Sequence, residues 1–154
     1  MRALELKIPP PIVALLVAAA IWGVSLVSRP PIDVFTLVRA VLATALALAG
    51  GAISLSGTVA FRRAKTTVNP MKPQSTSSLV TTGVYGFTRN PMYLGLLFVL
   101  VAWAAFLFSP WTLLGPLGFV FYMNRFQIEP EEKALATLFG AAFTTYKTKV
   151  RRWL

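Results

Sequence analysis

Three long apolar stretches of the chain carry no charged residue, and polar segments of different lengths separate them. Residues 8–28 and 40–61 are uncharged and apolar, and a third uncharged run extends from residue 90 to residue 124. A helix needs about 20 apolar residues to cross about 30 Å of hydrocarbon. The first two runs therefore predict one membrane span each, and the third is long enough for two.

The polar breaks predict how these spans are connected. Arg29-Pro30-Pro31 ends the first helix, and a second helix is expected from near Ile32 to about Phe61. Only Ser109-Pro110-Trp111 separates the third span, Met92 to Phe108, from the fourth, about Thr112 to Phe126. So short a connection predicts an antiparallel helical hairpin. The hairpin should return the chain to the membrane face from which the third span starts.

A polar loop precedes the hairpin, and an amphipathic segment follows it. Residues 62–90 show no helical period and predict a cytoplasmic loop, and so long a loop in a small protein is more often functional than a mere linker. In the last segment, 127–154, apolar residues recur at three- and four-residue steps after Pro130. This pattern predicts an amphipathic helix with proline at its first position. Its basic flanks would let it lie on the membrane.

Composition and charge favour a membrane protein over a soluble fold. Of 154 residues, 56% are hydrophobic and 13% are charged. We expect one all-α integral membrane domain over residues 1–154, with about four transmembrane helices and a C-terminal amphipathic helix. Most of the net charge of +10 falls on one side of these spans, so the positive-inside rule predicts that both termini are cytoplasmic. We expect a multi-pass protein of a bacterial inner membrane, with its first span retained and its cations facing anionic lipid rather than nucleic acid.

The chain contains no cysteine and no histidine. Their absence excludes disulfides, thiolate nucleophiles, Ser-His-Asp catalysis and metal sites built from these residues. We expect no metal. Carboxylates, arginine, lysine, tyrosine and backbone groups remain for any chemistry.

Arg89-Asn90-Pro91 stands where the polar loop meets the third span. Proline is tolerated in the first turn of a helix, so a helix should begin near Pro91. Arg89 and Asn90 then lie at a helix N-terminus, where free N–H groups favour an anionic ligand. The alternative is an interfacial cation beside a helix cap. The hairpin should bring Glu131 and Glu132 to this entrance, which would give an amino-acid-like cofactor a guanidinium for its carboxylate and a glutamate for its ammonium.

Two features of the second span also suggest contacts. Arg39 lies about two turns into it, where snorkelling toward Asp33 is one explanation and contact with a substrate carboxylate or phosphate is the other. Gly50, Gly51 and Gly57 would let another helix approach closely.

The central motif has a counterpart after the hairpin. Gly83-x-Tyr85-x-x-x-Arg89-Asn90-Pro91-x-Tyr93 is followed by Glu131-Glu132-x-x-Leu135-x-x-x-Phe139-Gly140 and by a tail with Tyr146 and Arg151-Arg152. Over about residues 67–154 this pattern resembles the integral membrane methyltransferases of the isoprenylcysteine carboxyl methyltransferase and phospholipid methyltransferase group. Their signature is Arg-His-Pro-x-Tyr with a distant Glu-Glu. The resemblance implies S-adenosylmethionine at the cytoplasmic face, capped by the C-terminal helix, and a lipophilic or prenylated substrate that enters from the bilayer.

By matching position, the resemblance also implies which residues line or support the cofactor site. They are Tyr85, Arg89, Asn90, Pro91, Tyr93, Glu131 and Glu132. Asn90 departs from the family, which usually has histidine at this position. Asparagine keeps a hydrogen bond but carries no proton, so a role that needs a basic imidazole is unavailable here.

Two classes of methyl acceptor remain open. A carboxylate acceptor is already ionised and needs only orientation, for which Arg89 or Arg125 is the candidate. An amine acceptor must lose a proton, for which Glu131 or Glu132 is the natural base. We favour carboxyl O-methylation, most like that of protein-S-isoprenylcysteine, with phospholipid amine N-methylation as the alternative. A non-catalytic scaffold that binds membrane lipid is a second alternative, and a transporter and a nicotinamide-dependent reductase are others.

Overall fold

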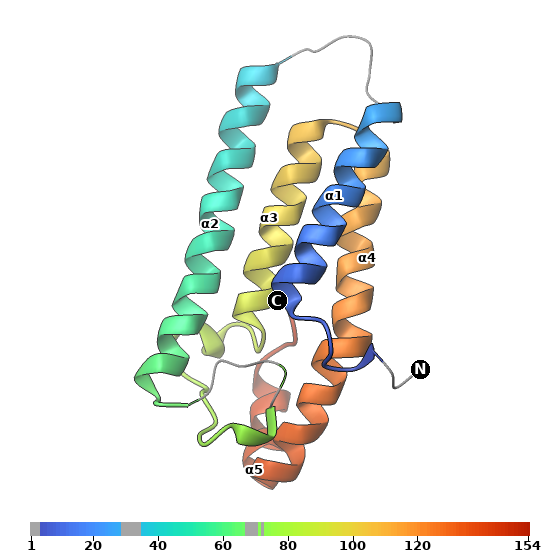
Figure 1. The fold of residues 1–154 in the computed structure, drawn as a ribbon. Helices are drawn as coiled ribbons and strands as arrows, with labels where there is room; N and C mark the ends of the chain where they lie inside the picture. The colour runs from blue at the N-terminus through green and yellow to red at the C-terminus, as the bar shows by residue number, and fades with distance from the viewer. Residues whose placement is uncertain (1–3, 29–34, 67–70, 72) are drawn as a thin grey trace.

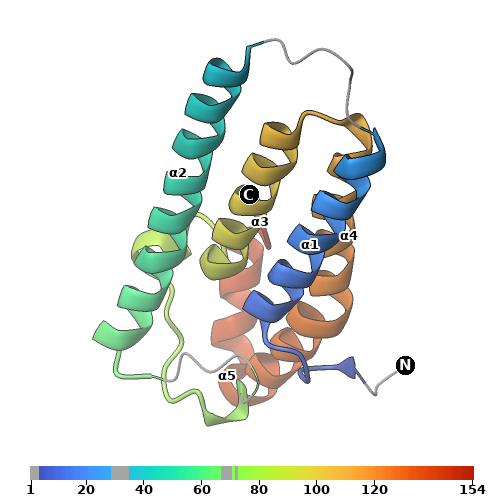
Figure 2. The same ribbon diagram turned by 45° about the horizontal axis from the view of Figure 1, so that its top comes forward.

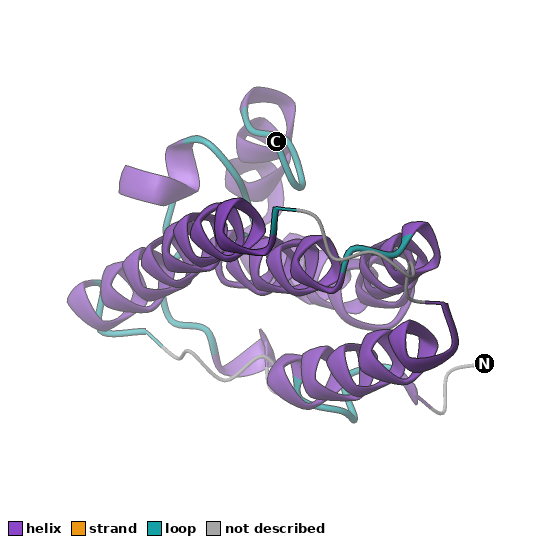
Figure 3. Ribbon diagram, turned by 90° about the horizontal axis from the view of Figure 1, so that it is seen from above, coloured by secondary structure: helices purple, strands orange, loops and turns teal. Residues whose placement is uncertain are grey.

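The computed structural model describes residues 4–28, 35–66, 71 and 73–154, and every regular element in these ranges is helical (Figure 3). The α-helices are α1 (Pro10–Ser28), α2 (Thr36–Arg63), α3 (Pro91–Leu107), α4 (Leu114–Tyr122) and α5 (Glu129–Lys149). Figure 1 shows α1 to α4 side by side in a bundle, with α5 at the end where α2 finishes. The predicted turn at Arg29-Pro30-Pro31, with Asp33, lies outside the described residues.

Glycines set the close crossing of α2 and α3. A Cβ atom on Gly50 would lie 2.6 Å from the carbonyl oxygen of Gly95, and one on Gly57 would lie 3.0 Å from the ring of Pro91. The predicted close approach is therefore confirmed at these two positions, because no larger side chain fits between the helices. Gly51 has nothing within 4 Å of such a Cβ, so it does not take part.

The core lies between α1, α3 and α4, whereas α2 presents much of its surface outward. Ile21, Leu100 and Phe119 are almost completely buried in this core. Large apolar side chains on α2 are exposed, including Leu37 and Leu48. α1 and α2 are long and apolar enough to cross a membrane, and α3 is a shorter apolar helix.

The predicted hairpin is confirmed, but the helix that follows it is longer than expected. α3 ends at Leu107, and a 3-10 turn at Pro110–Leu113 leads into α4. α4 then continues through a π-helical turn, Met123–Ile128, directly into α5. The predicted helix start at Pro130 is confirmed to within one residue, since α5 begins at Glu129, but α5 is not separate from the helix before it. Pro130 falls in the first turn of α5, where the missing N–H is tolerated, so it does not interrupt the chain.

The expected single C-terminal helix is wrong. Gly140 has φ 49° and ψ −121°, so the chain turns sharply inside α5. Such a backbone is accessible mainly to glycine. After this turn the chain comes back toward the start of α3 (Figure 2), where the N–H of Arg89 donates to the carbonyl of Arg151 at 3.1 Å. The C-terminal residues thereby become part of the region around Arg89.

Candidate functional site

A cavity of about 820 Å³, counting the space at its open mouth, lies between the end of α2, the loop before α3, the start of α3 and α5. Much of its wall is apolar, from residues such as Phe61, Leu79, Leu135 and Phe143. The larger polar and charged groups of the wall are Tyr85, Arg89, Asn90, Tyr93, Glu131, Glu132 and Tyr146.

The structure brings six of the seven implied cofactor residues to this cavity. The seventh, Pro91, is buried behind it and packs against Gly57 of α2. Arg125 does not line the cavity and instead pairs with Glu5 at 3.1 Å and with Glu129 at 3.6 Å.

Arg39 is also separate from this cavity. Its guanidinium lies 4.6 Å from the ring centre of Phe108. The start of α2 and the end of α3, which carry these residues, lie at the end of the bundle away from α5 (Figure 1). Arg39 lines a second, largely apolar groove between α2 and the α3–α4 connection. Arg39 and Arg125 are therefore the two predicted site residues that the fold does not bring to Arg89.

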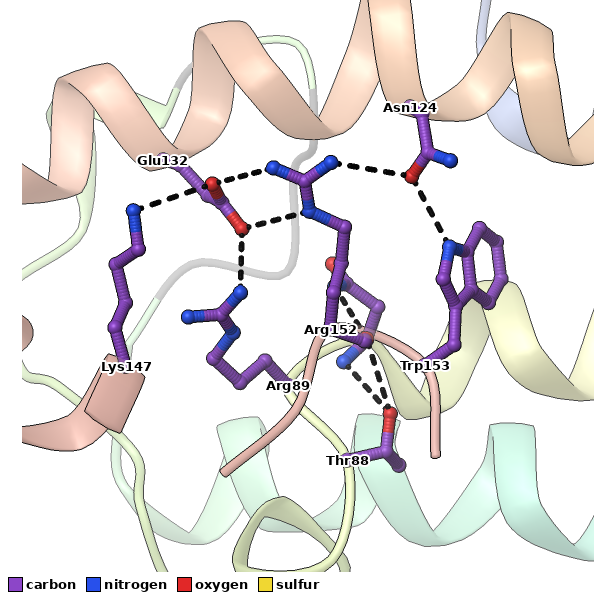
Figure 4. A network of polar contacts seen from close by, with 8 residues as sticks. Thr88, Arg89, Asn124, Glu132, Lys147, Arg152 and Trp153 are labelled. Carbon is purple, nitrogen blue, oxygen red and sulfur yellow. Dashed lines mark hydrogen bonds and ion pairs between the residues drawn. The ribbon is translucent and has the colours of Figure 1, made fainter. Parts of the chain in front are cut away.

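Glu132 is the centre of an ion cluster (Figure 4). Arg152 donates from Nε to Oε1 at 3.1 Å and from Nη2 to Oε2 at 2.9 Å, and Arg89 donates from Nη2 to Oε1 at 2.9 Å. Lys147 Nζ lies 3.6 Å from Oε2. Burial alone would raise the pKa of Glu132, but the Arg152 hydrogen bonds and the three cations outweigh burial and hold the pKa below its ordinary value. Glu132 is therefore ionised at neutral pH.

The C-terminal tail, residues 150–154, is held in place by several hydrogen bonds. The carbonyl of Arg152 accepts from Asn90 Nδ2 at 2.9 Å and from Thr88 Oγ1 at 3.3 Å. Asn124 Oδ1 accepts from Trp153 Nε1 at 3.0 Å and from Arg152 Nη1 at 3.5 Å. Asn90, which begins α3, thus uses its side chain to bind the tail rather than to cap its own helix.

Glu131 has a different environment from its neighbour. Its Oε1 accepts from Tyr93 Oη at 2.5 Å and from Gln127 Nε2 at 2.6 Å, both of which are neutral donors. Burial raises the pKa of Glu131 to about 7, although these two hydrogen bonds act in the opposite direction. This carboxyl can therefore gain or lose a proton near neutral pH.

Arg89 and Tyr85 contribute buried donors whose hydrogen bonds are not made within the described residues. Arg89 Nε, Arg89 Nη1 and the Tyr85 hydroxyl have no partner there. Burial raises the pKa of Tyr85, so its hydroxyl stays neutral and able to donate. Buried donors without acceptors are unfavourable. The cavity therefore suits a ligand that brings acceptor or anionic groups to Arg89 and Tyr85.

Several residues of this site were not among the predicted ones. Gln127 precedes Glu131 by four residues, which is the spacing of neighbours on one helix face, so it could have been found. Tyr146 donates to the carbonyl of Tyr85 at 2.7 Å, and burial raises the pKa of Tyr146 to about 12. Arg152 lies 20 residues from Glu132, and no local pattern predicts their contact.

Comparison with known proteins gives the family. The family model described as "Phospholipid methyltransferase" matches residues 38–142, more than half of the chain. An uncharacterized protein of Haemophilus influenzae is 46% identical over 63 residues, which are 41% of this chain and 100% of that protein. The protein-S-isoprenylcysteine O-methyltransferase of Saccharomyces cerevisiae is 37% identical over 82 residues, which are 51% of this chain but only 33% of that protein. No solved structure matches at a significant level. The chain belongs to the phospholipid methyltransferase family and is a membrane methyltransferase.

Proposed function

We propose that the protein transfers a methyl group from S-adenosylmethionine to the carboxylate of a lipophilic acid at the cytoplasmic membrane face, most like a protein-S-isoprenylcysteine carboxyl O-methyltransferase. One observation carries the proposal: Arg89 and Tyr85, which line an otherwise largely apolar cavity, carry buried donors that have no partner among the described residues. Such a cavity fits an amphiphilic acid and an amino-acid-like cofactor. The partial similarity to the yeast O-methyltransferase supports the same acceptor class.

The residues present fit S-adenosylmethionine, which supplies an electrophilic methyl group on a sulfonium. The guanidinium of Arg89 and the hydroxyl of Tyr85 would hold a carboxylate. The carboxylate of Glu131 suits an ammonium group, and the tyrosine rings suit a sulfonium cation. Every one of these groups lies on the wall of the same cavity.

A carboxylate acceptor requires little further chemistry from the chain. With such an acceptor, S-adenosylmethionine would supply the methyl group and leave as a neutral thioether, so the residues of the chain would have no proton to move. The protein then needs to align donor and acceptor and to exclude water. The apolar wall from Phe61, Leu79 and Phe143 would serve both purposes.

Phospholipid amine N-methylation remains a second candidate because of Glu131. An amine must lose a proton to a base whose pKa lies near the working pH. Burial raises the pKa of Glu131 to about 7, so this carboxylate has the required proton affinity. With an amine acceptor, kcat/KM should rise with pH through about 7, and Glu131→Gln should lose this rise. With a carboxylate acceptor, the reaction itself consumes no proton and needs no such base.

We further propose four membrane spans, with both termini in the cytoplasm of a bacterial inner membrane. The helices would be α1, α2, α3 and the continuous helical run of residues 110–128. Exposed cations gather near the cavity end, for example Arg62 and Arg63 at the end of α2 and Arg151 in the tail, as the positive-inside rule requires. A topology reporter fused after Leu154 tests this arrangement, and a non-cytoplasmic signal would contradict it.

Calorimetry with detergent-purified protein tests the cofactor proposal. Wild type should bind S-adenosylmethionine, and Arg89→Ala should weaken binding by about tenfold or more, because a charge-assisted hydrogen bond is lost. Lys133→Ala is the matched control, since this substitution removes one cation from the exposed surface of α5 outside the cavity. Transfer of tritiated methyl groups to lipid extracts would then identify the acceptor. Absence of binding to wild type would refute the proposal.

A further inference from the structure

Glu132 is shared unequally between two arginines. Arg152 approaches it with two N–H groups, one to each carboxylate oxygen, at 3.1 Å and 2.9 Å. Arg89 uses only Nη2, on a single oxygen at 2.9 Å. The Nε and Nη1 groups of Arg89 are left buried and without partners among the described residues. Figure 4 shows both arginines converging on Glu132 from different parts of the chain.

The unequal sharing has a physical consequence for Arg89. A carboxylate and a guanidinium pair most strongly through two parallel hydrogen bonds. If Arg152 did not occupy both oxygens of Glu132, a small rotation of this carboxylate would give Arg89 the two-bond pairing. That pairing would take Nη2 together with either Nε or Nη1, and it would leave Arg89 with fewer donors for a ligand.

Arg152 is fixed by contacts that do not involve Glu132. Its carbonyl accepts from Asn90 and Thr88, and its Nη1 lies 3.5 Å from Asn124 Oδ1. The indole of Trp153 donates to the same Asn124 oxygen at 3.0 Å. Because the tail is held on both sides, the guanidinium of Arg152 is already in place to meet Glu132.

We infer that Arg152 is a positioning residue whose pairing with Glu132 keeps this carboxylate from capturing Arg89, so that two N–H groups of Arg89 remain available to an anionic group of the ligand. The identity of that ligand as S-adenosylmethionine rests on the proposed function. The competition between Arg152 and Arg89 for Glu132 does not, because it exists in the free protein.

The first test examines the free protein by nuclear magnetic resonance with 15N-labelled arginine. The Nε–H signal of Arg89, assigned through Arg89→Lys, should shift in Arg152→Gln, because Glu132 then pairs with Arg89. Arg152→Lys keeps the charge but loses the two-bond fork, so it should shift the signal in the same direction. Adding Glu132→Gln to Arg152→Gln should remove the shift. An unchanged Arg89 signal in Arg152→Gln would overturn the inference.

The second test measures S-adenosylmethionine binding in a double-mutant cycle. Arg152→Gln should weaken binding by about tenfold, because Arg89 loses a charge-assisted hydrogen bond to the ligand. The double variant Arg152→Gln/Glu132→Gln should bind more tightly than Arg152→Gln alone, because the competitor for Arg89 has been weakened. A merely structural role, or misfolding, predicts that the double variant is no better, and that result would overturn the inference. If wild type does not bind the cofactor, the proposed function fails while the resonance measurement still decides the role of Arg152.

Discussion

Glu131 and Glu132 are neighbours on α5, but they face different surroundings and differ in their affinity for protons. On the tail side, Glu132 faces three cations, which hold its pKa below the ordinary value. On the α3 side, Glu131 faces Tyr93 and Gln127 and is so deeply buried that its pKa rises to about 7. Successive residues of a helix point about 100° apart, so adjacent positions in the sequence meet different surroundings.

This difference shows how one Glu-Glu pair can serve two purposes. The charged side is held by ion pairs and suits a fixed electrostatic role, whereas the other side can gain or lose a proton near neutral pH. A methyltransferase that acts on carboxylates needs mainly the charged side. One that acts on amines would also use Glu131.

Removing the carboxylate of Glu132 should have the largest effect on stability. Glu132→Ala leaves Arg89, Arg152 and Lys147 facing one another without a carboxylate, so the free energy of unfolding should fall by about 3 kcal/mol. Glu129→Ala is the matched control, because Glu129 is exposed and pairs with Arg125 at 3.6 Å, so it should lose less than about 1 kcal/mol. Denaturant unfolding in detergent measures both. Equal losses would mean that the cluster around Glu132 contributes no more than a surface ion pair.

The raised pKa of Glu131 should make the free energy of unfolding depend on pH. The folded protein keeps a proton on Glu131 up to about pH 7, whereas the unfolded chain releases it near 4.5. The folded state binds more protons between these values, so the stability of wild type relative to Glu131→Gln should fall as pH rises, by about 3 kcal/mol in total. Unfolding measured at pH 5 and pH 8 tests this. A difference that is constant or grows with pH would contradict the raised pKa.

Tyr93→Phe should raise the pKa of Glu131 further, because it removes a hydrogen bond that stabilises the ionised carboxylate. Its hydroxyl donates to Glu131 at 2.5 Å, so its loss should cost about 1 kcal/mol and move the pH-dependent loss of stability to higher pH. Tyr122→Phe is the control, because the buried Tyr122 hydroxyl has no hydrogen-bond partner among the described residues. It should cost little and leave the pH profile unchanged. Identical profiles for wild type and Tyr93→Phe would argue against this hydrogen bond.

The smallest effect is expected at the hydrogen bond between the Asn90 side chain and the C-terminal tail. Asn90→Ala loses the hydrogen bond to the Arg152 carbonyl, which should cost about 1 kcal/mol or less and speed amide hydrogen exchange in residues 150–154. Asn90→His restores an N–H donor and should exchange more slowly than Asn90→Ala. The opposite order would mean that the asparagine side chain does not hold the tail.

The sequence predicted the parts of the site that depend on helix lengths and short connections. Three residues between two apolar runs were enough to predict the hairpin, and with it the approach of Glu132 to Arg89, which is 2.9 Å in the structure. Gly50 and Gly57 also predicted the close crossing of α2 and α3, because a small residue in an apolar helix leaves room for a backbone.

The remainder depends on long-range contacts that local patterns do not encode. Gly140 fits the amphipathic period of its segment, so the pattern predicts an uninterrupted helix at the point where the chain turns sharply. Arg152 belongs to the basic tail of the sequence motif, but the motif predicts no partner for it, although it forms two hydrogen bonds with Glu132. Arg125 was expected near the reaction, but it joins the N-terminal segment through Glu5.

The π-helical turn at Met123–Ile128 sets the register of everything that follows it. A π turn bonds residue i to i+5 rather than i+4, and such turns are frequent at functional sites. One extra residue in such a turn leaves the following helix on nearly the same face, because the step from i to i+5 covers about the same rotation as i to i+4 in an α-helix. Deletion of one residue from a regular part of α4 would instead rotate Glu131 and Glu132 by about 100° and turn both carboxylates away from the cavity. In evolutionary terms, a change of one residue in length should be tolerated better within this turn than in the regular helix beside it.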